Sequence, residues 1–243
     1  MKVGSKLVFL FRDSEGFSTA ISDSLHPNPT NPSSVTLLEE PFELSLEPYG
    51  IKDVKASGTL LHFVDHQGFY QVSFLLMQNY EPPVLACAVN EVLGKIARGE
   101  SSSLPTVLVP FIVASSMLKR DGRSLTKSEN RVPIYGVQIG PETDTTKAVA
   151  ARTEKLLGSF QVHHEPLACL LQLARVLHLP TLILIGERGR LVSDKNIEDL
   201  EILHEIGEIL ASILNLSFSK DRIKWKPKVT SKNSVEPWRA LYG

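Results

Sequence analysis

Two short stretches of the chain follow apolar runs and carry side chains that could bind a phosphate or a small ligand. Asp13-Ser14-Glu15-Gly16 precedes a helical pattern, which is where phosphate-binding loops lie. It lacks the glycine spacing of the common nucleotide motifs, and its two carboxylates would repel a phosphate. Gly186-Glu187-Arg188-Gly189 follows the most apolar run, where α/β proteins bind ligands. We interpret both stretches as turns.

Two further stretches could supply a metal site or a nucleophile. His163-His164-Glu165 offers three potential ligands in a row, but adjacent residues do not easily point at one ion, and further ligands would have to come from elsewhere. Ser115-Ser116 follows an apolar run without the residues of a nucleophile elbow, so we expect it to cap or turn the chain. With Asp13, Glu142 and Glu187 these residues are scattered candidates. We assign no catalytic residue, no metal and no cofactor.

The last three residues, Leu241-Tyr242-Gly243, form a hydrophobic-Tyr-any motif that ends in a carboxylate. A protein can capture such an end as a unit, holding the carboxylate with a lysine or backbone amides and the ring in a cleft. The segment from Lys220 to Ala240 has seven Lys or Arg against two acids, which predicts a mobile basic tether. A frayed end without function is the alternative. Leu241, Tyr242 and Gly243 are our candidate partner-binding residues.

The elements that would position these residues alternate between apolar strands and amphipathic helices. We expect strands at 6–11, 59–64, 70–77, 83–89, 106–113, 132–139 and 181–185. We expect helices at 17–25, 90–98, 143–158, 167–178 and 196–216. Pro110 predicts a bulge or an edge position within its strand. Residues 26–32 and 119–131 are rich in proline or charge and are expected to be surface loops.

Strands that are apolar throughout are buried on both faces, so the helices between them must cover those faces. This predicts an α/β fold with a single mixed, largely parallel sheet flanked by helices, a Rossmann-like arrangement of three layers. The hairpin at 59–77 makes the sheet mixed. We expect one α/β domain at residues 1–218 and a flexible basic C-terminal tail at 219–243.

Composition limits the partners and the compartment. The chain has 243 residues, 42% apolar residues and a net charge of −1, which gives no general attraction to nucleic acid or to an anionic membrane. No apolar run is long enough to span a bilayer, and the first residues lack the pattern of a secretory signal. Cys87 lies in an apolar strand-like run and Cys169 on an apolar helical face, so both are expected in the core. We expect the cytoplasm, with the nucleus left open.

Residues 166–185, PLACLLQLARVLHLPTLILI, combine a small-residue helix, an aliphatic-Pro step and a buried strand. Residues 72–113 add a hairpin strand, a Pro-Val-Leu strand, a short helix and an apolar strand. These segments resemble the proteasome assembly chaperone family. The terminal Leu241-Tyr242-Gly243 is most similar to the end of the first subunit of the eukaryotic heterodimeric chaperone pair. The second subunit carries such a tail in some lineages, so the subunit stays open.

The resemblance implies a non-enzymatic chaperone for assembly of the proteasome core particle. It would form a heterodimer with a second assembly chaperone subunit and bind the ring of proteasome α subunits. Its tail would enter a pocket between α subunits, with Leu241 in the apolar part, Tyr242 donating a hydrogen bond and the Gly243 carboxylate paired with a lysine. The alternatives are a small-molecule or nucleotide-binding α/β enzyme and a scaffold subunit of another complex. A polar cluster at the strand ends would favour the enzyme.

Overall fold

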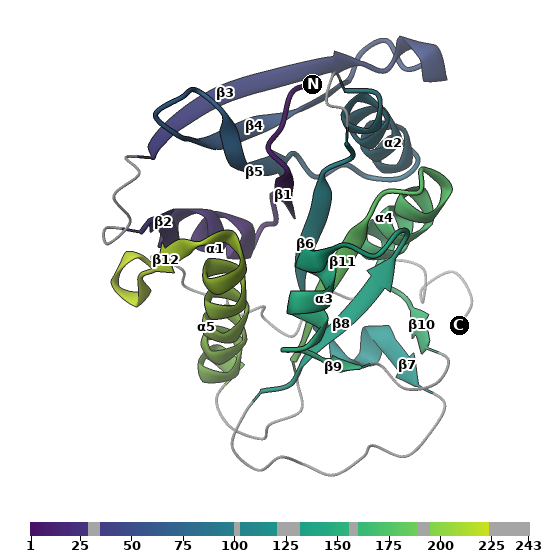
Figure 1. Cartoon of the computed structure of the whole chain (residues 1–243). Coiled ribbons are helices and arrows are strands. Elements are labelled where there is room, and N and C mark those ends of the chain that lie inside the picture. Colours follow the sequence, from purple (N-terminus) through teal and green to yellow (C-terminus); the bar gives the residue numbers. More distant parts are fainter. Residues whose placement is uncertain (29–34, 100–102, 121–131, 156–159, 189–194, 224–243) are drawn as a thin grey trace, which may run out of the picture.

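One mixed sheet organises the chain in the computed structural model, which describes residues 1–28, 35–99, 103–120, 132–155, 160–188 and 195–223 (Figure 1). Its strands follow the order β3-β4-β5-β1-β6-β11-β8-β9. They are β1 (Lys6–Phe11), β3 (Thr36–Ser45), β4 (Lys55–Val64), β5 (Tyr70–Met77), β6 (Thr106–Ala114), β8 (Ile134–Ile139), β9 (Glu154–Lys155) and β11 (Thr181–Arg188). The sheet confirms the predicted α/β class.

The centre of the sheet is parallel, antiparallel strands adjoin it on both sides, and β9 pairs parallel with β8 at one end. Strands β5, β1, β6 and β11 run parallel to one another. Strands β4 and β3 extend one side as antiparallel neighbours, and β8 pairs antiparallel with β11 on the other side. The predicted hairpin is the β4–β5 pair, with β4 starting four residues earlier than expected.

Helices cover both faces of the sheet, which gives the predicted three layers (Figure 1). Alternate residues of β1 point to opposite faces: Leu7 and Phe9 belong to one buried cluster, Val8 and Leu10 to the other. The first cluster includes α2 (Val84–Ala97) and α4 (Glu165–Val176). The second includes α1 (Phe17–Ser24), α3 (Asp144–Ala150) and α5 (Lys195–Leu214).

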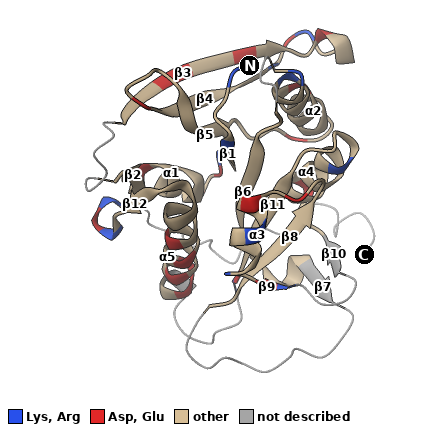
Figure 2. Ribbon diagram, viewed as in Figure 1, with Lys and Arg blue, Asp and Glu red and all other residues tan. Residues whose placement is uncertain are grey.

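Short elements complete the described part of the chain. Two small antiparallel pairs join β2 (Leu25–Pro27) to β12 (Leu216–Phe218) and β7 (Leu118–Arg120) to β10 (Phe160–Val162). Single 3-10 turns are η1 (Glu47–Tyr49), η2 (Ser115–Met117) and η3 (Lys220–Arg222). No helix among the described residues is long and apolar enough to cross a membrane. Acidic side chains mark two elements above others, β3 and α5 (Figure 2).

The strand predicted at 83–89 is wrong, because this run forms the first half of α2. A short apolar run does not distinguish a buried strand from a buried helix. Here the side chains of Leu85, Ala88 and Val92 recur at helical spacing and are fully buried against the sheet. Cys87 is therefore a half-buried helical residue that packs against the core, as Cys169 does on α4.

One predicted helix and two predicted loops also differ from the structure. The helix expected at 143–158 is the short α3, which ends at Ala150 and is followed by β9. The loops expected at 26–32 and 119–131 begin as parts of β2 and β7, and residues 29–32 and 121–131 lie outside the described residues. Each of these strands is very short and forms one small pair with a distant segment, which a local pattern does not reveal. The division at residue 218 stays a prediction.

Pro110 lies in the middle of the central strand β6. Strand β6 pairs with β1 only from Thr106 to Leu108, whereas its ladder with β11 continues to Ala114. The proline thus lies on a stretch whose β1 side is already unpaired, where its missing N–H removes no ladder bond. The predicted edge position is confirmed at Pro110, because β6 has no partner on its β1 side there.

Candidate functional site

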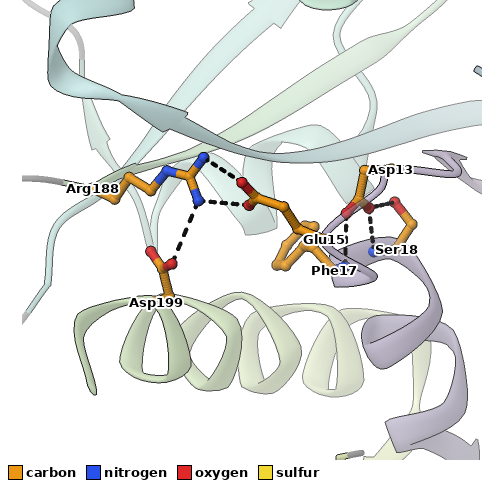
Figure 3. A network of polar contacts seen from close by, with 6 residues as sticks. All are labelled: Asp13, Glu15, Phe17, Ser18, Arg188 and Asp199. Carbon is orange, nitrogen blue, oxygen red and sulfur yellow. Dashed lines mark hydrogen bonds and ion pairs between the residues drawn. The ribbon is translucent and has the colours of Figure 1, made fainter. Parts of the chain in front are cut away.

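Strands β1 and β6 separate towards their carboxyl ends, and the polar residues that follow β1, β6 and β11 gather at this edge of the sheet. Open α/β sheets bind small ligands at this edge, where neighbouring strands part. We refer to Asp13, Glu15, Ser115, Arg188 and Asp199 as the carboxyl-edge cluster. Figure 3 shows its four charged members. Its members come from the β1–α1 loop, η2, the end of β11 and the beginning of α5.

Arg188 connects three elements through its guanidinium (Figure 3). Its two terminal nitrogens donate to the two carboxylate oxygens of Glu15 at 2.6 and 2.9 Å, a bidentate pair. Nη1 also lies 3.4 Å from Oδ2 of Asp199. The hydrogen bond with Glu15 raises the pKa of Arg188, so the group stays charged. The Arg188 side chain is 31% exposed. It lies between the β1–α1 loop and α5 and joins them at the carboxyl edge of the sheet.

Asp199 is the buried partner of this cluster. Its side chain is 5% exposed, and burial raises the pKa of its carboxyl group, with the neighbouring Arg188 acting in the opposite direction. One of its oxygens, Oδ1, has no hydrogen-bond partner within the described structure. The acidic stretch of α5 is therefore not exposed throughout. Glu198 and Asp199 are buried, whereas Glu201 and Glu208 are exposed to solvent.

The loop after β1 forms hydrogen bonds with the first turn of α1, the helix that follows it. Asp13 accepts hydrogen bonds from the backbone N–H groups of Phe17 and Ser18 at 3.0 and 2.9 Å, and from the Ser18 hydroxyl at 3.0 Å. Gly16 takes a left-handed conformation, with φ 84°, at the start of α1. A carboxylate of the chain therefore occupies the helix N-terminus that a phosphate would need. The predicted turn is confirmed.

The turn predicted at 186–189 is wrong for its described residues, because Gly186, Glu187 and Arg188 continue β11. Gly186 is required by packing: a Cβ there would overlap the side chain of Ile202 on α5. The expected turning role of Ser115 agrees with the structure, since it lies in η2 and its hydroxyl donates to the Arg188 carbonyl at 3.0 Å. Gly189 lies outside the described residues.

The His163-His164-Glu165 stretch begins a helix. His164 is the N-cap of α4, where its Nδ1 accepts from the N–H of Leu167 at 3.4 Å. Burial, with Arg188 nearby, lowers the pKa of His164. His163 and Glu165 are exposed. Across the described ranges, no group of three or more His, Cys, Asp or Glu side chains is arranged to hold a metal ion.

A serine, a histidine and a glutamate lie in line on β5, β4 and β3. The Ser73 hydroxyl lies 2.8 Å from Nδ1 of His62, and Nε2 of His62 lies 3.9 Å from Glu40. Hydrolases use such residues, but their serine must reach the substrate. Ser73 and His62 are fully buried, and the Ser73 hydroxyl already accepts the N–H of Gly4. We interpret this group as structural, and burial lowers the pKa of His62 accordingly.

The remaining candidates lie elsewhere. Glu142 follows β8, which runs antiparallel, so it lies at the opposite edge from Asp13 and pairs with Lys147 at 3.9 Å. A small cavity of about 30 Å³, lined by Gly4, Ile96 and Pro105 among others, holds at most a water molecule or two. The partner-binding candidates Leu241, Tyr242 and Gly243 lie outside the described residues.

The sequence did not reveal the Arg188 network, although each member was visible. Glu15 and Arg188 are separated by 173 positions, and Asp199 looked like one more acid on an amphipathic helix. A usable signal was a single arginine at the end of an apolar strand, because such a charge needs a carboxylate partner when it is half-buried.

Comparisons with known proteins give a family and a set of remote structural likenesses. The family model described as "Domain of unknown function (DUF7894)" matches residues 1–243. No curated protein matches the chain.

Several solved structures align over most of the chain. One is Pyrococcus furiosus PbaA, an archaeal homolog of proteasome-assembly chaperone: 14% identity, 92% of this chain, 84% of that chain, TM-score 0.48. Another is a Mycobacterium tuberculosis proteasome-assembly chaperone homologue: 11% identity, 89% and 88% coverage, TM-score 0.48. A third is an MTA/SAH nucleosidase: 10% identity, 88% and 96% coverage, TM-score 0.44. With TM-scores under 0.5, these likenesses carry no conclusion about function.

Proposed function

We propose a function for this chain, which belongs to the DUF7894 family, a domain of unknown function: it is a non-enzymatic chaperone for assembly of the proteasome core particle. It acts as a heterodimer with a second assembly chaperone subunit and binds the ring of α subunits. Its terminal Leu241-Tyr242-Gly243 enters a pocket between neighbouring α subunits. Two of the structures named above are proteasome-assembly chaperone homologues, but at their TM-scores the proposal does not rest on them.

The observation that carries the proposal is the closed carboxyl edge. The place where an α/β enzyme would bind its substrate contains a bidentate ion pair between Arg188 and Glu15. The adjoining helix N-terminus is bonded by Asp13. Opening this edge to a ligand would leave partly buried charges without partners, which is costly. A polar cluster at the strand ends is the feature expected of the enzyme, and it is present here, but most of its charged groups bind partners within the chain. This pairing favours contact with a macromolecule over small-molecule chemistry.

Of the two segments that carry the sequence resemblance, residues 166–185 adopt the expected helix, Pro step and strand, whereas the Pro-Val-Leu strand expected within residues 72–113 is the first half of α2. Helix α4 ends at Val176, Leu179 and Pro180 follow, and β11 begins at Thr181 and is fully buried at its start. Pro180 cannot continue the helix, and its carbonyl accepts the N–H of Val107 on β6. The Leu179-Pro180 step thus leads from α4 directly into β11 at the centre of the sheet.

The terminal tripeptide would supply the specific contact with the α subunits. In this proposal Leu241 fills an apolar subsite, Tyr242 packs and donates a hydrogen bond, and the Gly243 carboxylate pairs with a lysine of the pocket. A tail that is joined to an already docked domain binds with a high effective concentration. A short motif of modest affinity is therefore sufficient.

Affinity purification from a native extract tests the proposal. The full chain should recover proteasome α subunits together with a second α/β chaperone subunit. Tyr242→Ala should recover several-fold less α subunit, whereas Ser234→Ala in the same tail should behave like the parent chain. Recovery of neither α subunits nor a second chaperone would contradict the proposal, as would equal recovery by Tyr242→Ala.

One observation favours the alternative, a small-molecule α/β enzyme. Oδ1 of Asp199 is buried without a hydrogen-bond partner in the described structure, so it could accept a bond from a ligand at the carboxyl edge. Thermal unfolding with a set of nucleosides and nucleotides separates the two functions. A ligand that stabilises the parent chain but not Asp199→Asn would support the enzyme.

A further inference from the structure

Strand β3 ends the sheet and offers an unpaired edge. It pairs with β4 over ten positions, from Thr36 to Ser45, and no other strand of the described structure pairs with its outer side. Two of its apolar side chains are open to solvent, Leu37 at 57% and Leu38 at 42%. A long exposed edge strand is a template for a further strand unless charges or prolines protect it. Strand β3 contains Pro41, which has no N–H to donate, so an added strand would bond to the positions on either side of it.

The two faces of β3 differ in chemistry. Residues of an antiparallel pair that lie opposite each other share a face, so Glu39 with Leu61 and Glu43 with Ser57 lie on one side. Leu38, Phe42 and Leu44 lie on the other side by alternation. The acidic residues of β3 are visible in Figure 2. One face of β3 thus carries Glu39 and Glu43 together with Leu37 and Pro41, and the other carries three apolar side chains together with Glu40.

The acidic face is not neutralised by the domain itself. Glu39 makes no ion pair with another described residue, and Glu43 pairs only with Lys55, both of which are more than 60% exposed. Glu40, on the other face, lies near Tyr70 and His62. A strand added at this edge would meet Glu39, unpaired among the described residues, and the exposed Glu43–Lys55 pair on one face, and mostly apolar side chains on the other.

Residues 224–229, Lys-Trp-Lys-Pro-Lys-Val, have the complementary pattern with a period of two. In an extended conformation Lys224, Lys226 and Lys228 share one face, while Trp225 and Val229 share the other. The segment follows Ile223, the last described residue. Ile223 packs against the same apolar cluster as Val35, which directly precedes β3.

We propose that the outer edge of β3 is the docking site of residues 224–229 of the same chain. The segment adds as a further strand, with its lysines on the face of Glu39 and Glu43 and with Trp225 and Val229 on the face of Leu38 and Phe42. Main-chain hydrogen bonds supply affinity and the alternate side chains supply the register. Residues 230–243 continue beyond the docked strand, so the terminal tripeptide would be held from a fixed point on the domain.

A second copy of β3 fits this edge less well. Pairing of two such strands about a two-fold axis would bring glutamates of one copy near those of the other, and like charges across strands are destabilising. The proposal does not depend on the proposed chaperone function, because docking of 224–229 is a property of the isolated chain. Failure of α-subunit binding would leave it intact.

Hydrogen exchange of the full chain, measured by mass spectrometry on peptides covering 36–45, tests the docking. The triple variant Lys224→Glu/Lys226→Glu/Lys228→Glu reverses the charge of the segment. Its β3 amides should exchange about tenfold faster than those of the parent chain, because favourable cross-strand pairs become repulsive. Reversal of two charges farther along the tail, Lys232→Glu/Arg239→Glu, should leave β3 unchanged. Peptides from β11 serve as an internal control for global stability in every variant.

A variant in which β3 and the segment exchange their charges gives the decisive comparison. Adding Glu39→Lys/Glu43→Lys to the triple reversal should restore the slow exchange of β3. Equal exchange in the parent chain and the triple variant would overturn the proposal. Protection of β3 that increases with protein concentration would overturn the same-chain docking as well, since it would assign the added strand to a second molecule.

Discussion

The carboxyl edge and the β3 edge of one sheet handle charge in opposite ways. At the carboxyl edge Glu15, Arg188 and Asp199 bind one another, and only Arg188 and Glu15 keep partial exposure. On β3 the exposed Glu39 makes no ion pair with any described residue. The edge at which this fold usually binds ligands is thus occupied by ion pairs within the chain, whereas the outermost strand leaves Glu39 exposed and without an ion pair among the described residues.

The largest effect should come from breaking the paired edge. Arg188→Ala leaves the carboxylates of Glu15 and Asp199 without the guanidinium, and Asp199 is buried. We expect the free energy of unfolding in urea to fall by about 2 kcal/mol, less than for a fully buried pair because Arg188 is partly exposed. The control is Arg175→Ala, which removes an exposed arginine of α4 and should change stability by about 0.5 kcal/mol or less. Equal stability of both variants would mean that the network does not close the edge.

A matched pair of glutamates sharpens the comparison. Glu15→Gln weakens a bidentate, charge-assisted contact and should cost roughly 1 to 2 kcal/mol. Glu39→Gln makes the same chemical change on an exposed strand and should cost about 0.3 kcal/mol or less. Chemical denaturation of both variants at one pH measures the difference. If Glu39→Gln proved the more costly, the assignment of the two edges would have to be reversed.

The smallest effect should appear in the pH dependence of stability. The folded-state pKa of Asp199 is raised by burial above its ordinary value of 3.8. Between these two pKa values the folded state binds more protons than the unfolded state, so stability is lost as the pH rises through the folded pKa. Asp199→Asn cannot ionise and should lack this loss.

The corresponding measurement is the free energy of unfolding of the parent chain and of Asp199→Asn from pH 4 to pH 7. The stability of the parent chain should decline relative to the variant as the pH rises over this range, because the folded-state pKa of Asp199 is raised by burial. Parallel curves would indicate that Arg188 compensates the burial of Asp199 completely.

Much of the fold followed from local patterns. The apolar runs of β1, β6, β8 and β11 are strands, and the helical spacing of α5 was correct to within two residues at each end. The first half of α2 was mistaken for a strand because a run that is apolar throughout carries no usable period. Strand β3 was not predicted, because only its end, near Leu44, alternates clearly between apolar and polar residues.

The sites were less predictable than the elements. Asp13 as a turn residue could be foreseen, since its neighbours already argued against a phosphate. The link from Glu15 to Arg188 could not, because a contact between distant residues depends on strand order, which the sequence did not supply. Gly186 suggested a turn, while its actual role is to let Ile202 approach β11. The tail residues Leu241, Tyr242 and Gly243 stay a prediction.

The central claim is that this domain is stabilised by a closed carboxyl edge and binds its partners through the terminal tripeptide. The most direct measurement compares the full chain with a variant lacking residues 241–243, in binding to isolated α-ring intermediates and in thermal unfolding. We predict that the deletion weakens binding about tenfold or more and leaves the melting temperature unchanged. Equal binding by the two proteins, or a lowered melting temperature of the deletion variant, would contradict the claim.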